Sequence, residues 1–388
     1  MAELNETPRG NRIHIAFFGL RNAGKSTLVN AFTGQQIAIV SDVPGTTTDP
    51  VSKAMEILPL GPCLITDTAG LDDVGELGGQ RVRKTLDVLE RADIAVWVDG
   101  LDETAENAEK RKDFLIACRQ RNVTVLEFHR GDSVEELKRK IAEVKIGEKS
   151  PGLLDGLVKE GDRILCVCPI DESAPKGRLI LPQVQVIREC LDRHVACTVC
   201  QPEELSDWLI AGLSDLKGSV LVVTDSQAFG SVNQAIQQSN NPTIRLTSFS
   251  ILFARQKGDL DEYAKGLKAI GNLKDGDTVL VAEGCTHHRQ CNDIGTVKIP
   301  KALEKLSGRK LKFEFSSGGA FDLRRAEDVA PYRLVVHCGG CMLTRREVLR
   351  RIALAKEAGV PIVNYGLLLA AASGIDVGRL VQPLTANN

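Results

Sequence analysis

The chain has 388 residues, which at roughly 100–200 residues per domain predicts two or three domains. Hydrophobic residues make up 43% of the sequence and charged residues 26%, a mixture with enough apolar material for a buried core. The 49 Lys and Arg residues nearly balance the 51 Asp and Glu residues. A net charge of −2 argues against broad, charge-driven binding to nucleic acid or to anionic membranes.

No apolar run approaches the about 20 residues that cross a bilayer, and the start of the chain lacks the apolar stretch of a signal peptide. We therefore expect a cytoplasmic protein with no membrane segment. Its 11 cysteines should stay reduced unless they bind a metal, and structural disulfides are not expected.

The first predicted domain, residues 1–148, alternates apolar runs with amphipathic stretches. The runs that predict strands are 13–18, 63–66, 94–98 and 123–126, and the helical patterns are 25–32, 80–89, 105–119 and 133–144. Buried strands that alternate with helices predict an α/β fold with a doubly wound, mostly parallel sheet.

A linker rich in breaking residues, 147–152, precedes two further predicted α/β domains. Residues 153–258 contain strand patterns at 164–168, 195–199 and 220–223, with helices at 183–192 and 233–238. Residues 259–388 contain strand patterns at 278–282, 312–315, 334–336 and 361–364, with a helix near 345–358. The sequence thus predicts three α/β domains.

Residues 19–26, Gly-Leu-Arg-Asn-Ala-Gly-Lys-Ser, have the spacing of a phosphate-binding loop. They follow a predicted strand and open a predicted helix, so backbone N–H groups would surround phosphates at a helix N-terminus. We expect Lys25 to reach the β- and γ-phosphates and the Ser26 hydroxyl to bind Mg²⁺. The other nucleotide-binding residues of this loop are expected to be Gly19, Asn22, Ala23, Gly24 and Thr27.

Two later segments predict a nucleotide switch. In Asp67-Thr68-Ala69-Gly70, the Asp67 carboxylate can join the Mg²⁺ shell and the Gly70 N–H can contact a γ-phosphate. In the loop 44–49, Pro-Gly-Thr-Thr-Thr-Asp, Thr47 can bind Mg²⁺ only while a γ-phosphate is present. The expected catalytic residues are therefore Lys25, Thr47, Asp67 and Gly70.

These motifs resemble those of the translation-factor-related GTPases, and most closely the tRNA-modification GTPases called TrmE or MnmE. The resemblance implies that Asn22 helps to bind K⁺. Leu71 stands where Ras-type proteins place a water-orienting Gln, and Leu cannot orient water by a hydrogen bond. We expect slow GTP hydrolysis, with a monovalent cation supplying the charge that an arginine finger supplies elsewhere.

The base-reading loops depart from that pattern. Guanine selectivity normally comes from Asn-Lys-x-Asp after the fifth strand, but here the strand pattern is followed by His129-Arg130-Gly131-Asp132. Asp132 can still accept from the N1 and N2 donors of guanine. In a second alignment this tetrad is the last base-contacting loop, and Asn-Lys-x-Asp is missing. Either way one base-reading element is damaged, so we expect guanine preference with low affinity.

Two short segments near the C-terminus hold candidate metal ligands, and 49 residues separate their histidines. The segments are Cys285-Thr286-His287 and His337-Cys338-Gly339-Gly340-Cys341, and each follows a predicted strand. In an open α/β sheet, ligands bind outside the carboxyl ends of the strands. We therefore expect both segments to lie at one binding edge.

The residue types leave several chemistries open at this edge. The three thiolates Cys285, Cys338 and Cys341 suit an iron–sulfur cluster, whose remaining iron would bind a weaker ligand. Candidates for that ligand are Glu283, His287, His337, water or an incoming molecule. Structural Zn²⁺ fits the same residues equally well, and a redox pair or a metal-free cysteine core stays open.

The succession of a GTPase module and these cysteines resembles the FeFe-hydrogenase maturation GTPases, the HydF family. The signature Cys-x-His, a gap of about fifty, then His-Cys-x-x-Cys is met at Cys285, His287, His337, Cys338 and Cys341. The resemblance extends over nearly the whole chain. Further matching segments are 169–171, 174–183, 224–229, 247–250, 293–295 and 364–366.

This resemblance implies a 4Fe-4S cluster on Cys285, Cys338 and Cys341, with a labile fourth position for which Glu283 is the local candidate. It implies a homodimer that forms through the middle domain, 153–258, with the cluster in the last domain, 259–388. It also implies that the dimer carries a diiron precursor bearing CO and cyanide and delivers it to apo FeFe-hydrogenase. The implied partners are two radical-SAM maturases, HydE and HydG. GTP would modulate partner exchange. The alternative is a TrmE-like GTPase that acts on tRNA or the ribosome and has a structural zinc site.

Overall fold

The structure is a computed structural model of the chain. It describes residues 7–36, 50–72, 75–100, 104–145, 151–170, 177, 179–211, 218–284, 293–318, 325–378 and 380. Contacts divide the chain into two units, Met1–Lys149 and Ser150–Asn388. A boundary at residue 258 within the second unit stays a prediction.

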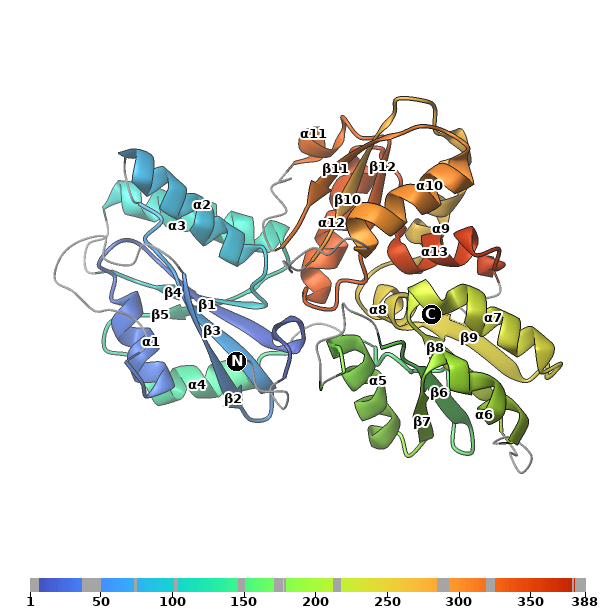
Figure 1. Cartoon of the computed structure of the whole chain (residues 1–388). Helices are drawn as coiled ribbons and strands as arrows, with labels where there is room; N and C mark the ends of the chain where they lie inside the picture. Colours follow the sequence, from blue (N-terminus) through green and yellow to red (C-terminus); the bar gives the residue numbers. More distant parts are fainter. Residues whose placement is uncertain are drawn as a thin grey trace. The chain divides into compact units, whose positions relative to one another are not determined.

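The first unit is built on a five-stranded sheet with the order β2-β3-β1-β4-β5 (Figure 1). Every neighbouring pair is parallel except β2 with β3. The strands are β1 (Ile13–Phe18), β2 (Val51–Ile57), β3 (Gly61–Asp67), β4 (Ile94–Val98) and β5 (Thr124–Phe128). The helices are α1 (Lys25–Thr33), α2 (Gly75–Leu89), α3 (Ala105–Gln120) and α4 (Val134–Glu143), with a short turn η1 (Arg9–Asn11).

Helices cover both faces of this sheet. One apolar cluster joins the sheet to α1 and α4 through side chains that include Phe17, Phe32 and Ile141. A second cluster joins the other face to α2 and α3 through Leu89 and Phe114, and Figure 1 shows the two helix layers on opposite sides. Because helices bury both faces, the central strands carry continuous apolar runs, and those runs made them predictable.

The edge strand β2 is the strand of the first unit that the sequence did not predict. Most of its residues are exposed or half-buried, and its sequence, Val-Ser-Lys-Ala-Met-Glu-Ile, contains no apolar run. An antiparallel edge strand buries only part of one face, so its pattern is weak.

The second unit contains two four-stranded parallel sheets, with the orders β7-β6-β8-β9 and β11-β10-β12-β13. The first has β6 (Arg163–Val167), β7 (Ala196–Cys200), β8 (Val220–Thr224) and β9 (Ile244–Ser248). The second has β10 (Thr278–Ala282), β11 (Lys312–Ser316), β12 (Leu334–His337) and β13 (Ile362–Asn364).

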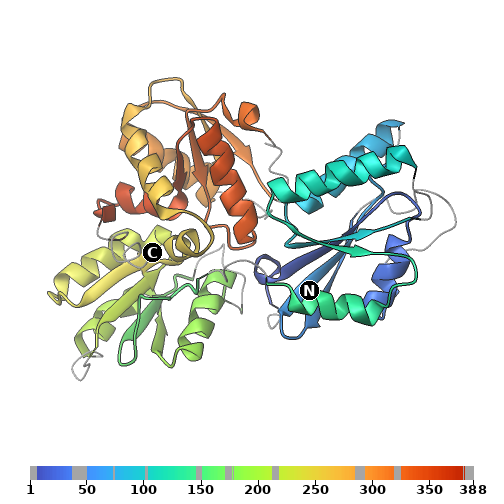
Figure 2. The ribbon, with the colours of Figure 1, turned by 180° about the vertical axis from the view of Figure 1, so that it is seen from behind.

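Helices surround both sheets of this unit, as the reverse view in Figure 2 shows. They are α5 (Leu181–Asp192), α6 (Leu205–Ala211), α7 (Phe229–Gln238), α8 (Phe249–Lys257), α9 (Leu260–Ala269), α10 (Ile299–Ser307), α11 (Ala326–Val329), α12 (Arg345–Glu357) and α13 (Tyr365–Ala372). Short turns are η2 (Pro202–Glu204), η3 (Ser226–Ala228), η4 (Ile270–Asn272) and the π-helical η5 (Ile294–Lys298). The predicted α/β class is thus confirmed for the described chain.

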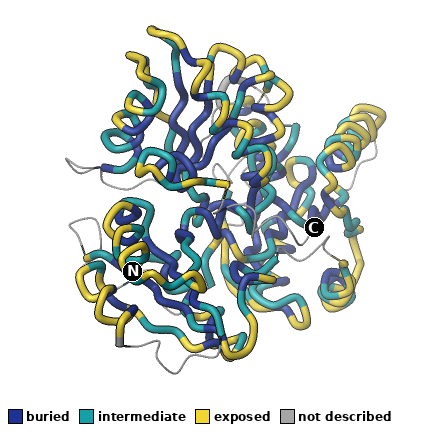
Figure 3. The backbone as a smooth tube through the Cα atoms, turned by 90° about the vertical axis from the view of Figure 1, so that its right-hand side faces the viewer, coloured by how far each residue is buried: buried dark blue, intermediate teal, exposed yellow. Residues whose placement is uncertain are grey.

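One apolar core runs through both sheets of the second unit. It contains Cys166 and Val223 of the first sheet, Val281 and Val336 of the second, and Phe253 of α8. Figure 3 shows the strands mostly buried and the exposed residues on turns and outer helix faces. Because α8 follows β9 of the first sheet and packs against α12, α13 and β13, it is one of the elements that join the two sheets.

Among the described residues, no helix combines the length and the apolar composition needed to cross a bilayer.

Candidate functional site

The phosphate-binding loop has the position that the sequence predicts, between the end of β1 and the start of α1. Gly24 precedes α1 with φ +88°, and Asn22 has φ +59°, both in the left-handed region. A Cβ atom on Gly19 would lie 2.5 Å from the Val98 carbonyl oxygen, so only glycine fits against the end of β4 there. The loop is therefore shaped by backbone geometry at the helix N-terminus, where an anion binds favourably.

Lys25 lies folded over this loop. Its Nζ donates to the Leu20 carbonyl at 2.6 Å and to the Gly19 carbonyl at 3.3 Å, and the residue is only 7% exposed. These contacts hold a positive charge beside the loop amides, where a bound phosphate would meet it.

Ser26 and Asp67 meet directly, although 41 positions separate them in the sequence. The Ser26 hydroxyl donates to Asp67 Oδ2 at 2.6 Å. Asp67 ends β3 and is fully buried, and this burial raises the pKa of its carboxyl. Its Oδ1 is also buried and has no hydrogen-bond partner among the described residues. A buried carboxylate oxygen with an unused acceptor beside a hydroxyl fits a Mg²⁺ site.

The segment after β3 packs on the phosphate loop. The Leu71 N–H donates to the Gly19 carbonyl at 3.3 Å, and Asp72 Oδ1 accepts from the Arg21 N–H at 2.5 Å. A Cβ atom on Gly70 would lie 2.8 Å from the Arg21 nitrogen, so this close approach requires glycine. Asp72 was not among the predicted site residues, because nothing in the local sequence pattern shows that it contacts the loop. Thr47 lies outside the described residues.

A cavity of about 490 Å³ lies beside the loop, at the ends of β4 and β5. Four predicted nucleotide-binding residues line it, namely Asn22, Ala23, Gly24 and Thr27. Asp99, Phe128, Arg130 and Gly131 line it as well. Its place next to the phosphate loop is suitable for the base and ribose of a nucleotide.

The tetrad 129–132 follows β5, which pairs with β4, so it occupies the place where Asn-Lys-x-Asp is expected. Among the described residues of this unit there is no sixth strand in the sheet. Asp132 Oδ2 accepts from the His129 N–H at 2.8 Å, and His129 Nδ1 lies 2.6 Å from Asp99 Oδ2. The described geometry thus favours the first alignment and places Arg130, rather than Asp132, on the cavity wall.

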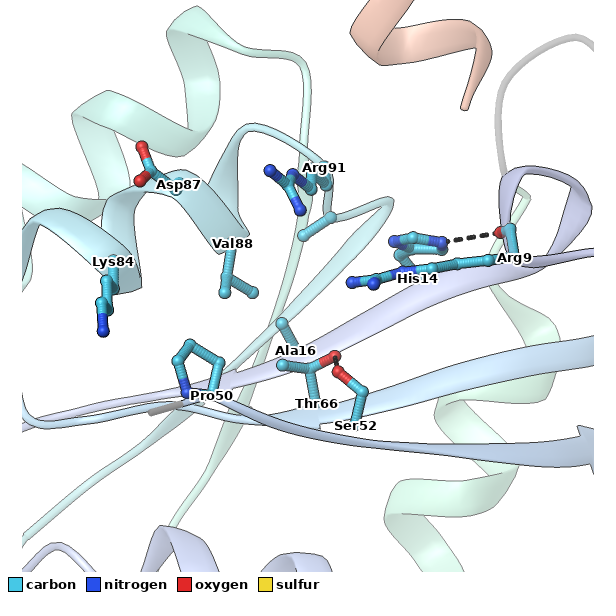
Figure 4. A pocket seen from close by; sticks show the side chains of 11 residues that line it. Arg9, His14, Ala16, Pro50, Ser52, Thr66, Lys84, Asp87, Val88 and Arg91 are labelled. Atoms are coloured by element: carbon cyan, nitrogen blue, oxygen red, sulfur yellow. Dashed lines mark hydrogen bonds between the residues drawn. The ribbon is translucent and has the colours of Figure 1, made fainter. Parts of the chain in front are cut away.

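A second cavity, of about 260 Å³, lies under α2 on the other face of the sheet (Figure 4). Basic and hydroxyl side chains line much of it, including Arg9, Ser52, Thr66, Lys84 and Arg91. His14 also lines it and is paired through Nε2 with the Arg9 carbonyl at 3.0 Å. No predicted site residue lies on this wall, and His14 has an internal sheet position with a backbone partner.

The C-terminal segments meet as the topology predicts. β10 and β12 are parallel neighbours, with Ala282 opposite His337, so their carboxyl ends lie at one edge. There the Gly284 N–H donates to Cys338 Sγ at 3.1 Å. Cys285 and His287 fall outside the described residues. Among those described, no group of three His, Cys, Asp or Glu side chains is arranged to hold a metal.

Cys338 and Cys341 lie on a tight loop after β12. Cys338 Sγ also accepts from the Gly340 N–H at 3.4 Å, and Gly340 has φ +67°. Burial raises the pKa of Cys338 and raises that of Cys341 to about 11, so both are thiols at neutral pH without a metal. Backbone N–H donors that point at the sulfur of the half-buried Cys338 fit a thiolate that binds metal, because hydrogen bonds to sulfur tune iron–sulfur sites.

His337 has partners at both ring nitrogens. Arg351 Nη1 lies 3.2 Å from Nε2, and since arginine only donates, Nε2 accepts and Nδ1 donates to the Cys338 carbonyl at 2.7 Å. Burial and the neighbouring Arg351 lower the pKa of His337 to about 3, so the ring is neutral. To bind iron, His337 would have to give up one of these hydrogen bonds.

Glu283 is buried at the same edge, with Tyr365 Oη 3.5 Å from its Oε1. A Cβ atom on Gly295 would lie 2.3 Å from that carboxylate oxygen. Asn364 donates from Nδ2 to the Cys338 carbonyl at 3.3 Å and caps α13. The segments 293–295 and 364–366, which the sequence analysis could only note as matching, thus form the wall around Glu283 and Cys338.

The other cysteines among the described residues lie in or against the apolar cores. Cys166 is buried on β6, and Cys168 is buried directly after the end of that strand. Cys197 packs in the core shared by the two sheets, whereas Cys200 packs in a cluster on the opposite face of its sheet.

Three family models match the chain in series. A model described as 50S ribosome-binding GTPase matches residues 14–128. A model described as hydrogen maturase F dimerization domain matches residues 153–258, and one described as hydrogen maturase F tetramerization domain matches residues 261–383. The match over residues 153–258 agrees with the dimerisation domain that the resemblance implies. The tetramerization description of the last segment was not predicted.

Individual relatives match the chain mainly through its first part. A tRNA modification GTPase MnmE of Endomicrobium trichonymphae is 41% identical over 108 residues, which are 26% of this chain and 23% of the relative. A GTPase Der of Clostridium botulinum is 29% identical over 191 residues, 47% of this chain and 40% of the relative. The chain thus spans less than half the length of these curated relatives.

Among solved structures, Era of Aquifex aeolicus is 16% identical, with a TM-score of 0.26 over 79% of this chain and 92% of the Era chain. That likeness is too weak to bear on the fold. The two hydrogen maturase F domains behind a GTPase domain show the family directly. The chain belongs to the hydrogen maturase F family, and the segments described as its dimerization and tetramerization domains follow a GTPase domain.

Proposed function

We propose that this chain is a cytoplasmic scaffold that holds the diiron precursor of the FeFe-hydrogenase active site on or near a 4Fe-4S cluster and delivers it to apo-hydrogenase. The observation that supports this most is the loop of Cys338 and Cys341. It follows a parallel strand at the binding edge of its sheet, and Cys338 Sγ accepts two backbone hydrogen bonds there. We assign residues 1–148 to nucleotide binding, 153–258 to dimerisation and 259–388 to the cluster.

In this proposal, Cys285, Cys338 and Cys341 hold the cluster. When bound, the cluster supplies one iron with an exchangeable position. Glu283 is the proposed fourth ligand, because its buried carboxylate lies one residue before Gly284, whose N–H contacts Cys338 Sγ. His287 and His337 remain the other protein candidates, and His337 would first have to release Arg351 or the Cys338 carbonyl.

We further propose that the first unit hydrolyses GTP slowly and acts as a switch. Lys25 would bind the β- and γ-phosphates. Ser26 and Thr47 would hold Mg²⁺, with Asp67 beside them. The ammonium group and the metal ion would together neutralise negative charge on the phosphates. Gly70 would contact the γ-phosphate through its N–H. Because Leu71 and Asp72 contact the phosphate loop, a bound phosphate would reposition the start of α2.

Hydrolysis should depend on the monovalent cation. We expect turnover in K⁺ buffer to exceed that in Na⁺ buffer at equal ionic strength by roughly tenfold or more, because the cation replaces an arginine finger worth about 10³–10⁵ in rate. Phosphate release would measure it. The variant Asn22→Ala should remove the difference, since Asn22 lines the nucleotide cavity. Equal turnover in the two buffers would contradict this proposal.

The proposed partners are a second copy of this chain, apo FeFe-hydrogenase and the two radical-SAM maturases HydE and HydG, with no nucleic acid or membrane partner. The test is a transfer experiment without oxygen. The chain is reconstituted with iron and sulfide, loaded with a synthetic diiron complex that bears CO and cyanide, freed of excess complex and mixed with apo-hydrogenase.

We expect hydrogen evolution only with the loaded, iron-containing chain. A chain reconstituted with Zn²⁺ instead serves as the control and should give none. If the iron-containing chain also activates no hydrogenase, the carrier function is wrong. A purified, oxygen-free protein that is colourless and zinc-loaded would favour the alternative of a structural zinc site.

A further inference from the structure

The helix α8 follows β9 of one sheet, yet several of its residues contact the cysteine loop of the other. Ser250 Oγ donates to Asn364 Oδ1 at 3.2 Å, and a Cβ atom on Gly339 would lie 3.2 Å from the same Ser250 oxygen. Arg345, at the start of α12, donates to the Gln256 carbonyl. The cysteine loop is therefore assembled from both matched hydrogen maturase F segments.

The strongest of these contacts comes from Lys257, the last residue of α8. Its Nζ donates to three backbone carbonyl oxygens, that of Leu343 at 2.6 Å, that of Cys341 at 3.1 Å and that of Gly340 at 3.3 Å. An ammonium group has three hydrogens, so the loop takes all of them. Lys257 is 2% exposed, and its Nζ lies 5.4 Å from the centre of the Phe253 ring.

Burying an ammonium group is unfavourable unless nearby negative charge offsets the lost hydration. Within the part of the chain that the structure describes, no carboxylate forms an ion pair with Lys257. The groups whose charge acts on it are Cys341, Glu347 and Cys338. Three carbonyl dipoles offset part of the cost, and thiolates bound to iron would supply the remaining negative charge.

We propose that Lys257 positions the Cys338–Cys341 loop and balances the negative charge of the cluster bound there. The inference rests on the proposed cluster and adds a residue to it from outside the last segment. It assigns α8 the role of building part of the cluster site from the dimerisation segment.

The test compares Lys257→Met with the wild type after anaerobic reconstitution and gel filtration. We expect the variant to retain less than a third of the wild-type iron per chain. Any cluster that remains should have a more negative midpoint potential, because the positive charge of Lys257 stabilises the reduced form in the wild type and the variant lacks that charge. Lys305→Met is the matched control: Lys305 also donates to a backbone carbonyl, that of Ala372 at 2.9 Å, but on the exposed side of α10.

A second variant, Lys257→Gln, keeps a hydrogen-bond donor and removes the charge. It should retain more iron than Lys257→Met but show the same shift in midpoint potential. If thermal melting shows that Lys257→Met does not fold, the test is made with Lys257→Gln. If the folded variants have the iron content and midpoint potential of the wild type, the role of Lys257 is wrong and the proposed cluster still stands. A wild-type protein that takes up no iron would overturn the proposed cluster and this inference together.

Discussion

Replacing Lys25 with Ala should abolish GTP hydrolysis and leave iron loading near the wild-type level. Lys25 supplies the only positive side chain that the structure shows folded over the phosphate loop among its described residues, through the Gly19 and Leu20 carbonyls. Loss of one preorganised charge-stabilising donor costs roughly 10²–10³ in rate, and here phosphate binding would be lost too. Phosphate release and iron per chain, measured on one preparation, would check both parts.

Lys112→Ala is the control for this variant, because Lys112 is exposed on α3 of the same unit. It should leave both measurements unchanged. If Lys25→Ala also lowered the iron content of a folded protein, nucleotide and cluster sites would depend on each other for assembly, and the modular view of the chain would be wrong.

Replacing Cys338 with Ser should remove most of the bound iron. The Cys338 sulfur accepts from the Gly284 and Gly340 N–H groups, which fix its position at the edge of the sheet. A serine oxygen keeps the size of the side chain but not the soft thiolate that iron–sulfur clusters require. Iron quantification and electron paramagnetic resonance after anaerobic reconstitution should show a small fraction of the wild-type cluster, with hydrolysis of GTP retained.

Cys197→Ser is the matched control, since Cys197 is a half-buried cysteine in the first sheet of the same unit and lies outside the predicted cluster site. It should load iron normally. Full iron content in Cys338→Ser would contradict the ligand assignment, and equal loss in both variants would point to a general folding defect.

The features that the sequence predicts well are those whose causes are local. The phosphate loop needs glycine at fixed spacing between a strand and a helix, so Gly19, Gly24 and Lys25 disclose it without any knowledge of the fold. The central strands are equally legible, because burial on both faces demands continuous apolar runs. The meeting of the β10 and β12 ends also followed from the rule for parallel sheets.

The features that escaped prediction depend on contacts between distant segments. Lys257 contacts a loop 83 to 86 positions away, and no local pattern separates it from any other lysine at a helix end. His337 was predicted as a possible ligand from its neighbour Cys338, whereas its tie to Arg351 arises from the packing of α12 on β12. The position of Arg130 on the wall of the cavity beside the phosphate loop likewise depends on where β5 places its loop.

The core that runs through both sheets of the second unit has a consequence for how the gene can be divided. A truncation after Gly258 would remove α12, α13 and β13, against which α8 packs, and would expose part of the apolar surface of α8 to water. Each half would then expose an apolar surface that promotes aggregation. Insertions, tags and fusion partners should therefore be placed at the ends of this unit rather than at the point where the two matched segments join.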